Sequence, residues 1–399
     1  MLYYNAIKIL IYATPFIDSF NGLAMSVGGA VIFGQIIRVP IIVGMILLLG
    51  KINFRYFMIS LFALAVFLTK DVVFSGVFVS DVVTSITIDF RYLYVLVFCQ
   101  LLISCYKKGI ISTDDLLVWG KKAVLIFAVI IILSKISGVG LNYAGANKGL
   151  FIEVNALTAL LVWGVSIWLY PLYFTKFTRI DLCGGVLMVL ATGSQATKTG
   201  LLGVCIVMLY YGVVKAVKRK NARALISTLM LVIIGCFGVY FYLASELGAT
   251  VLSRWQYFMA RMDFFTFLVS GRNIALQVAF SEWSSDILYI LCGFGYSIGA
   301  KLTFGHNPTL SYGGPEMDLL DIGFFYGIIA MCVVTYYTVK PIVHYTFAET
   351  ERSCIVFSYI LLWGIMFLGG HVLGSPMAGI FYAVAYVMAM YRGKTVFRK

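Results

Sequence analysis

Apolar segments alternate with short polar segments along the whole chain of 399 residues. Most of the apolar segments are roughly 17–25 residues long, the length at which an α-helix crosses the hydrocarbon core of a bilayer. This pattern predicts an all-α polytopic membrane protein with about twelve transmembrane helices in one integral membrane domain, residues 1–399. The predicted spans are 4–19, 29–50, 54–73, 87–106, 117–136, 152–170, 181–195, 199–215, 223–243, 317–339, 353–370 and 375–392.

One predicted connection is much longer than the others. Residues 244–316 separate the ninth and tenth predicted helices by about 70 residues with little hydrophobic periodicity, and connections of that length are usually functional. A second polar connection, residues 137–151, is rich in glycine and asparagine. Both connections follow an odd-numbered helix, so they lie on the same side of the membrane. We expect the chemistry of the protein on that side.

The composition supports a membrane location and removes one alternative. Hydrophobic residues make up 61% of the chain, charged residues make up 12%, and the mean hydropathy is +0.96. A soluble domain is nearer to about half apolar and about a quarter charged. The net charge of +13 would suggest nucleic-acid binding in a soluble protein. Here the basic residues concentrate on alternate connections, as they do in membrane proteins, so we expect no nucleic-acid partner.

The distribution of basic residues also predicts the orientation. If the N-terminus is cytoplasmic, about two thirds of the 30 Lys and Arg residues fall on cytoplasmic connections or on the C-terminal tail, which is where such residues are enriched. The first segment lacks a short apolar core followed by a small-residue cleavage site, so we interpret it as a helix and not as a removed signal peptide. Both termini are therefore predicted to be cytoplasmic, with the 244–316 connection outside.

Several basic residues lie near the outer ends of the predicted helices, against this rule. They are Lys148, Lys198, Arg254, Arg261, Arg272 and Arg91. Arginine binds phosphate oxygens through two parallel hydrogen bonds, so the cluster favours a diphosphate site. The alternative is that each side chain extends to lipid headgroups. Lys198 belongs to the hairpin ATGSQATKTGLLG just where a helix begins, and backbone N–H groups at a helix start also favour phosphate.

Two of the three histidines are predicted to lie on the outer side. His306 falls in the long connection and His371 at the outer end of the eleventh span, whereas His344 falls in an inner connection. A neutral imidazole in the outer position can accept a proton from a hydroxyl group. The alternatives are that His371 bonds a carbonyl group at a helix end and that His306 orders its own loop.

Three carboxylates stand at the start of the tenth predicted helix, in the segment SYGGPEMDLLDIGFFYG, residues 311–327. Carboxylates are costly at a membrane, so they require partners. Acidic residues complement the positive end of a helix, and Pro315 suits a first helical turn, so capping is one explanation. The other is that Asp318 and Asp321, on one helix face, position cations or sugar hydroxyl groups, with Glu316 as a possible base.

Six segments, taken in order, resemble those of the Wzy-type O-antigen and capsule polymerases. Each motif is loose, and the resemblance covers nearly the whole chain. The segments are IDSFNGL (17–23), ANKGLFIEVNAL (146–157), GSQATKTGLLG (193–203), SGRNIALQVAF (270–280), GFGYSIG (293–299) and PEMDLLDIGFFYGIIA (315–330).

The resemblance implies an inner-membrane glycosyltransferase of Gram-negative bacteria with a GT-C-like fold. Members of that family transfer a growing glycan from undecaprenyl diphosphate to a lipid-linked oligosaccharide repeat unit on the periplasmic side. The implied partners are this lipid-linked oligosaccharide and membrane lipids, with a chain-length regulator and a flippase as further candidates. Because the donor is already activated, no nucleotide sugar, metal or other cofactor is expected, and none of the eight cysteines has a metal-binding spacing.

The resemblance also implies roles for particular residues. Lys198 and Arg272 match basic residues of the family motifs, and Glu316 and Asp318 match the acidic start of the late helix. His306-Asn307 resembles the His-Asn pair of the related O-antigen ligases, so His306, Glu316 and Asp318 are the expected catalytic residues. Binding of substrate and diphosphate is expected from Lys198, Arg272, Arg254, Arg261, Arg91, Asp321 and His371.

Two other functions are compatible with this pattern. An O-antigen ligase would transfer the glycan to the lipid A core. A flippase or other transporter also has about twelve spans, but it typically has internal repeats and helices broken near the middle of the membrane. The long outer connection and the cations at the helix ends favour the polymerase.

Overall fold

The computed structural model describes residues 1–26, 33–74, 79–143, 146–174, 178–220, 222–296, 315–343 and 350–391. Each of the twelve predicted spans coincides with a helix. In chain order these helices are α1 (Leu2–Ser26), α2 (Phe33–Ile52), α3 (Phe54–Phe74), α4 (Val79–Lys107), α5 (Thr113–Ser137), α6 (Val154–Phe174), α7 (Arg179–Ser194), α8 (Lys198–Arg219), α9 (Ala222–Ala244), α15 (Asp318–Val343), α16 (Thr350–Leu368) and α17 (Pro376–Tyr391).

Five segments of these helices are long and apolar enough to cross a bilayer by length and composition. They are Ile86–Lys107, Thr113–Ser137, Val154–Phe174, Lys198–Lys218 and Asp318–Val343. Four shorter helical segments are also apolar, namely Phe54–Phe67, Leu225–Tyr240, Ser353–Leu368 and Pro376–Tyr391. These helices indicate a membrane-embedded helical protein.

Two helices form the centre of the bundle. Every residue of α6 from Ala156 to Leu169 is buried, as is every residue of α17 from Pro376 to Met390. Glycine permits the close approach of α17 to α4, because a Cβ atom at Gly379 would lie 2.1 Å from Cγ2 of Val95. Small residues commonly allow such contacts between membrane helices.

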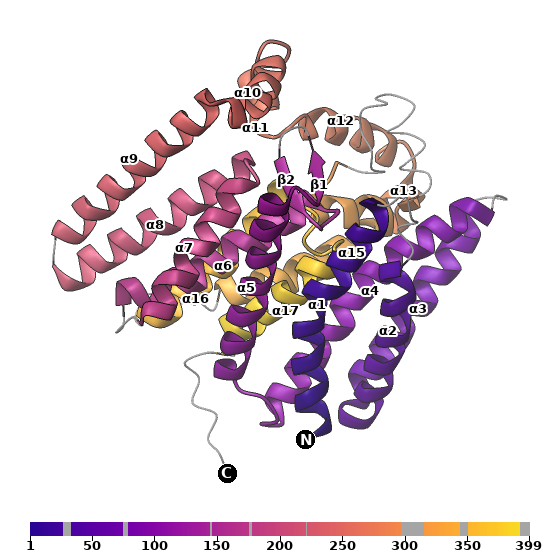
Figure 1. Ribbon diagram of the computed structural model, residues 1–399. Coiled ribbons are helices and arrows are strands. Elements are labelled where there is room, and N and C mark those ends of the chain that lie inside the picture. The colour runs from indigo at the N-terminus through magenta and orange to yellow at the C-terminus, as the bar shows by residue number, and fades with distance from the viewer. Residues whose placement is uncertain are drawn as a thin grey trace.

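Helix α9 is the peripheral counterpart of α6. It packs against α8 and α10 and lies at the edge of the bundle in Figure 1. Its large apolar side chains remain exposed, for example Ile234 at 61% and Phe237 at 57%. A helix that is apolar on an exposed face is expected where lipid is the solvent, because its backbone groups are satisfied within the helix.

The first and last described helix ends lie at one end of the bundle, the lower end in Figure 1. The Tyr4 hydroxyl donates to Asp115 at the start of α5 over 3.2 Å, and the Tyr106 hydroxyl at the end of α4 donates to the Tyr391 carbonyl over 3.5 Å. Since α4 turns into α5 there, α1 begins and α17 ends on the same side.

The opposite end, the upper end in Figure 1, carries the remaining elements. A β-hairpin pairs β1 (Leu141–Tyr143) with β2 (Ala146–Gly149). The 244–316 connection, whose sequence has little hydrophobic periodicity, forms four short helices in its described part. These are α10 (Glu246–Met259), α11 (Phe264–Leu268), α12 (Arg272–Trp283) and α13 (Ile287–Cys292). Helices α11 and α13 have only five and six residues, which is too few for a clear 3.6-residue periodicity to be visible in the sequence.

Helix α15 is broken, which the sequence pattern did not predict. Gly327 has φ 86° and ψ 171°, so the helix is interrupted after its first nine residues. The break receives the turn after α13, because the Phe294 N–H donates to the Phe324 carbonyl over 2.8 Å. A Cβ atom at Gly327 would lie 2.0 Å from the Leu291 carbonyl oxygen, so only glycine fits.

Candidate active site

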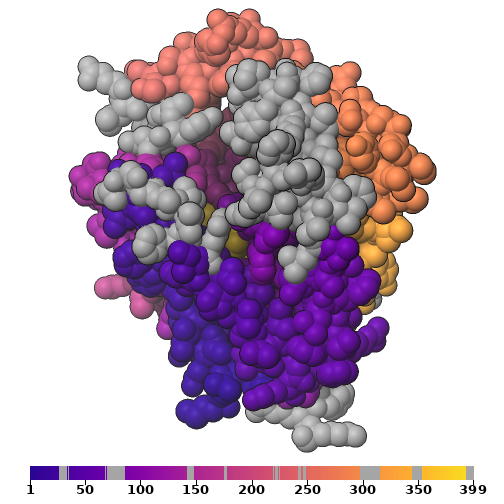
Figure 2. Space-filling model, turned by 90° about the vertical axis from the view of Figure 1, so that its right-hand side faces the viewer, coloured from indigo at the N-terminus to yellow at the C-terminus, as the bar shows by residue number. Residues whose placement is uncertain are grey.

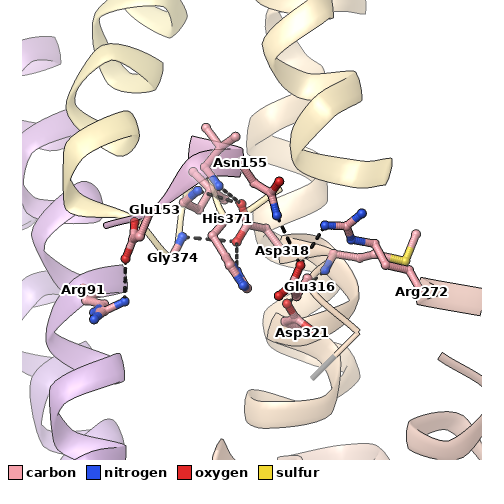
Figure 3. A network of polar contacts seen from close by, with 12 residues as sticks. Arg91, Glu153, Asn155, Arg272, Glu316, Asp318, Asp321, His371 and Gly374 are labelled. Carbon is pink, nitrogen blue, oxygen red and sulfur yellow. Dashed lines mark hydrogen bonds and ion pairs between the residues drawn. The ribbon is translucent and has the colours of Figure 1, made fainter. Parts of the chain in front are cut away.

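Three segments far apart in the sequence meet at Glu316, at the upper end of the bundle (Figure 3). The Glu316 Oε2 accepts a hydrogen bond from Nη2 of Arg272 over 2.7 Å and from Nδ2 of Asn155 over 3.2 Å. Arg272 is the first residue of α12, and Asn155 is the second residue of α6. Pro315 and Glu316 precede α15, so Pro315 does not lie in its first turn as expected.

Backbone conformation directs both members of the Arg272–Glu316 pair. Glu316 has φ 58°, a left-handed conformation that is uncommon outside glycine. Ser270 and Gly271, ahead of Arg272, also have positive φ values of 58° and 79°. Such conformations persist where the surrounding structure enforces them, and they cluster at functional sites.

The Arg272 guanidinium retains unused hydrogen-bonding capacity. Its side chain is 11% exposed, and its Nη1 donates to the Val269 carbonyl over 3.3 Å. Its Nε–H is buried and has no hydrogen-bond partner among the described residues. A buried donor without a partner is costly, so a ligand oxygen at this position would be favoured.

Asp318 is fully buried and holds a loop in place. Its carboxylate accepts hydrogen bonds from the backbone N–H groups of Val372, Leu373 and Gly374, over 2.5, 2.7 and 3.2 Å. Its Oδ1 also lies 3.8 Å from Nδ1 of His371. These contacts use both carboxylate oxygens, so the geometry favours a positioning role over the catalytic role expected from the sequence.

Asp321 is closer to the capping role that the sequence also allowed. Its Oδ2 accepts the Met317 N–H over 3.0 Å, one turn before it. The side chain is fully buried, and Oδ1 has no hydrogen-bond partner within the described part of the chain. No hydrogen bond or ion pair joins Asp321 to Arg272 or Lys198 in the described part of the chain. Glu316 makes the expected contact with a cation instead.

His371 lies between α16 and α17, where it faces carboxylates. Burial by itself lowers the pKa of His371, but the Asp318 carboxylate 3.8 Å away and the negative charges of Glu316 and Asp321 together raise that pKa to about 9. The imidazole is therefore protonated at neutral pH, and a protonated imidazole cannot act as a base. This charge suits the binding of an anion better than proton abstraction.

Asp318, Asp321 and His371 are the described residues most nearly arranged for a metal ion. One ligand atom of each lies within 4.8 Å of the other two. However, three backbone N–H groups occupy the Asp318 oxygens, and metal binding requires a neutral imidazole. The arrangement fits a protonated His371 in the place of a cation better than it fits a metal centre.

Lys198 approaches the same region from the hairpin between α7 and α8. Thr158 of α6 anchors the hairpin through its Oγ1, which donates to the Gln195 side chain over 2.9 Å. The Lys198 ammonium donates to the Phe267 carbonyl and lies 4.0 Å from the centre of the Phe267 ring. The positive charges of Arg272 and Arg254 act on the Lys198 ammonium. We call Lys198, Arg254, Arg272 and Glu316 the cationic site.

Three of the expected cations lie elsewhere. Lys148, in β2, donates to the Ile152 carbonyl over 3.1 Å. Arg261 is exposed at the end of α10 and stacks over Tyr257 at 3.9 Å. Arg91 pairs with Glu153 over 2.9 Å, and Figure 3 places it on the opposite side of His371 from Arg272. His306, with the control residue His344, lies outside the described residues.

The sequence interpretation missed Glu153 and Asn155. Both belong to the segment ANKGLFIEVNAL, which was singled out as a motif without assigning these residues a role. Polar residues directly before the fully buried stretch of α6 were the available signal, since buried polar groups require partners.

Comparisons with known proteins do not assign the chain to a family. No protein-family model matches it, and no curated protein matches its sequence. We therefore infer the function from the site and from the motif resemblance.

Proposed function

We propose that this protein is a Wzy-type polysaccharide polymerase of a Gram-negative inner membrane. It would join undecaprenyl-diphosphate-linked oligosaccharide repeat units at the upper end of the bundle and release undecaprenyl diphosphate. In this proposal the twelve helices coinciding with the predicted spans cross the membrane in a GT-C-like arrangement. The lower end, with both termini, faces the cytoplasm, and the upper end faces the periplasm.

The observation that carries the proposal is the convergence of Lys198, Arg254 and Arg272 beside membrane-embedded helices. The described contacts of Lys198 are a carbonyl oxygen and an aromatic ring, neither of which neutralises its charge. Arg272 has a buried Nε–H available. Partly buried cations of this kind stabilise charge that develops on a leaving group. A diphosphate attached to a membrane lipid is a leaving group that would reach this location.

The chemistry requires one base and no redox step. An acceptor hydroxyl oxygen attacks the anomeric carbon of the donor glycan, and the bond from that carbon to the diphosphate oxygen breaks. Undecaprenyl diphosphate leaves with the electron pair, and the hydroxyl proton passes to the base. Glu316 suits this role, because Arg272 and Asn155 hold Oε2 while Oε1 makes no hydrogen bond to the described residues. His306 stays the second candidate for the base.

One feature favours a second candidate, a lipid-linked oligosaccharide transporter. The break in α15 at Gly327 is of a kind that transporters place at their binding sites. Here protein covers the break, since a Cβ atom at Gly293 would lie 2.4 Å from the Phe325 carbonyl carbon. Close packing of this kind is expected of a fixed support better than of a moving gate.

The test uses purified protein and a synthetic undecaprenyl-diphosphate-linked repeat unit, with the products separated by length on a gel. A polymerase makes a ladder of products and releases one undecaprenyl diphosphate for each bond that it forms. We expect the ladder to persist in EDTA. A ligase would make product only when lipid A core is added. A transporter would make no ladder, but it would move the unelongated lipid across proteoliposomes. Either of the last two results would overturn the proposal.

A further inference from the structure

A second polar site lies beside the first, between the upper ends of α1, α2 and α4. It is a cavity of about 230 Å³, which the segment before α6 and the start of α17 also line. Figure 2 shows this face of the molecule hollowed above the indigo and purple helices, with gold atoms of the C-terminal part of the chain visible inside. Pro376 and Met377 belong to that part and line the cavity.

Helical spacing brings its polar side chains to one place. On α4, Thr87, Arg91 and Tyr94 follow one another at intervals of four and three residues, so they share a helix face. On α1, Asp18 and Asn21 do the same. The apolar lining includes Phe90 and Ile42, which gives the cavity an amphipathic surface.

The charges of this cavity are balanced in pairs. Arg38 forms an ion pair with Asp18, and both side chains are 13% exposed. Arg91 forms an ion pair with Glu153 over 2.9 Å. Among the described residues, the lining thus contains two cations and two carboxylates, each cation facing its own partner. We call this cavity, with Asp18, Arg38, Arg91 and Glu153, the paired cavity.

Balanced charges disfavour an anionic ligand. A phosphate group would have to displace a carboxylate from each arginine, and breaking a partly buried ion pair is costly. An acyl chain is also disfavoured, because it would remove these charges from water without offering hydrogen bonds. A neutral ligand that both donates and accepts hydrogen bonds remains.

The unused hydrogen-bonding capacity agrees with such a ligand. Asp18 Oδ2 is buried and accepts no hydrogen bond from the described residues, although Oδ1 binds Arg38. A sugar hydroxyl group could donate to this oxygen and accept from a neighbouring N–H group. The rings of Phe90 and Tyr94 line the same cavity and offer apolar surface to the C–H face of a sugar.

The volume limits the size of the ligand. At about 30 Å³ per water molecule, a cavity of 230 Å³ holds roughly eight waters. It is smaller than the roughly 300–1,000 Å³ pockets that enclose drug-sized ligands. One sugar ring therefore fits inside the cavity.

We infer that the paired cavity binds a single neutral sugar residue of the lipid-linked glycan, an inference that rests on the proposed function. Two chain segments connect it to the cationic site. Glu153 of the cavity is two residues from Asn155, which binds Glu316, and Pro376 is two residues from Gly374, which binds Asp318. Figure 3 shows this continuous line of polar side chains from Arg91 to Arg272. A glycan could then place one ring in the cavity while its diphosphate lies among the cations.

The test measures binding of free sugars by saturation-transfer NMR on the purified protein in lipid nanodiscs. The probes are D-glucose, D-galactose, N-acetyl-D-glucosamine and N-acetyl-D-galactosamine, with D-glucuronate as an anionic sugar. Inorganic pyrophosphate, followed by phosphorus NMR, reports separately on the cationic site. We expect at least one neutral sugar to bind, with glucuronate at least tenfold weaker.

Variants locate the binding. Thr87→Phe fills the cavity, and Asp18→Asn removes the charge of the unpartnered oxygen; each should reduce the sugar signal at least fivefold and leave pyrophosphate binding at the cationic site intact. Retained pyrophosphate binding also shows that the variant is folded. The control is Asp181→Asn, which breaks a comparably buried ion pair with Lys121 away from both sites, and it should change neither signal.

The outcomes distinguish the sugar site in the paired cavity from the proposed polymerase function. Suppose that pyrophosphate binding depends on Arg272, but Thr87→Phe does not reduce sugar binding. This result would overturn the proposed sugar site in the paired cavity and leave the proposed polymerase function intact. Sugar binding lost in Thr87→Phe, without pyrophosphate binding, would count against the polymerase and keep the sugar site. Stronger binding of glucuronate or pyrophosphate in the paired cavity would overturn the inference from charge balance.

Discussion

The cationic site and the paired cavity use the same residue types in opposite ways. In the paired cavity, Arg38 and Arg91 each have their own carboxylate. In the cationic site, Arg272 binds Glu316, whereas Lys198 contacts only uncharged groups among the described residues. A paired arginine mainly orders its surroundings, and an arginine or lysine with a net charge attracts an anion. The difference indicates that the number of partners, more than the number of cations, decides which ligand a polar membrane site accepts.

The largest effect is expected where the net charge acts on the leaving group. Arg272→Ala should lower the rate of polymerisation by about 10³-fold, because removing one donor that stabilises developing charge costs about 10²–10³-fold in rate. Arg272→Lys should retain only part of the wild-type rate, since Lys lacks the planar guanidinium group that donates two parallel hydrogen bonds. The measurement is the initial rate of ladder formation at saturating lipid-linked substrate.

The matched control is Arg261→Ala, in the same 244–316 segment. Arg261 is exposed and stacks on Tyr257, so this variant should polymerise within about twofold of wild type. Equal losses in the two variants would show that the cations act through overall charge and not through a defined site.

The next effect concerns Asp318, which holds the loop of residues 372–374 between the two sites. Asp318→Asn should lower the free energy of unfolding by about 3 kcal/mol, because an amide cannot replace a carboxylate that accepts three backbone N–H groups. Asp321→Asn should cost about 1 kcal/mol, since Asp321 accepts one N–H in a cap-like contact. Chemical unfolding of the purified variants in detergent micelles measures both values. Equal destabilisation by the two substitutions would contradict the positioning role of Asp318.

A third substitution gives the paired cavity a net positive charge, as in the cationic site. Glu153→Gln leaves Arg91 without its carboxylate, so the paired cavity becomes net positive. We expect the KM for lipid-linked substrate to rise about tenfold, equivalent to about 1.4 kcal/mol, with little change in kcat. Pyrophosphate binding should gain a second, weaker site. Asp181→Asn makes the same change of charge at Lys121, and a similar effect there would show that general electrostatics, not the cavity, is responsible.

The smallest effect is a dependence of stability on pH. Folding raises the pKa of His371 from its usual 6.5 to about 9, against the lowering effect of burial, through Asp318, Glu316 and Asp321. Its stabilising contribution is therefore complete below about pH 6.5 and is lost as pH rises through about 9. The midpoint of thermal unfolding should fall by a few degrees over that range, and His371→Gln should show a flatter curve. A parallel curve for this variant would mean that His371 does not carry the charge.

Local chemistry accounts for much of what could be predicted of the fold. The helices coincide with the predicted spans because segment length and hydropathy are properties of neighbouring residues. Capping is equally local. Ser112 and Asp115 form a capping box at the start of α5, and Thr178 and Asp181 form one at the start of α7. A carboxylate at the start of a helix therefore suggests a cap, which is correct for Asp321 in outline.

The same local interpretation could not distinguish the partners of Asp318, Glu316 and Arg91. All three are charged residues near helix ends, yet one binds the backbone of residues 372–374, one binds Arg272 and Asn155, and one binds Glu153. The two residues of each contact are between 44 and 161 residues apart in the sequence, so they meet only after the helices pack. The burial of His371 among carboxylates, which makes it a poor base, has the same origin.

By itself, the sequence determined that the chain is a helical membrane protein, where its helices lie, and which charged residues stand near their ends. These properties follow from the length and polarity of contiguous segments, because a bilayer selects each segment largely independently. The tertiary structure alone decided the break of α15 at Gly327, the pairing of Arg91 with Glu153, and the separation of the charged residues into two sites. Those properties depend on the distance between segments remote in sequence, and only the packing of the helices around α6 and α17 sets that distance.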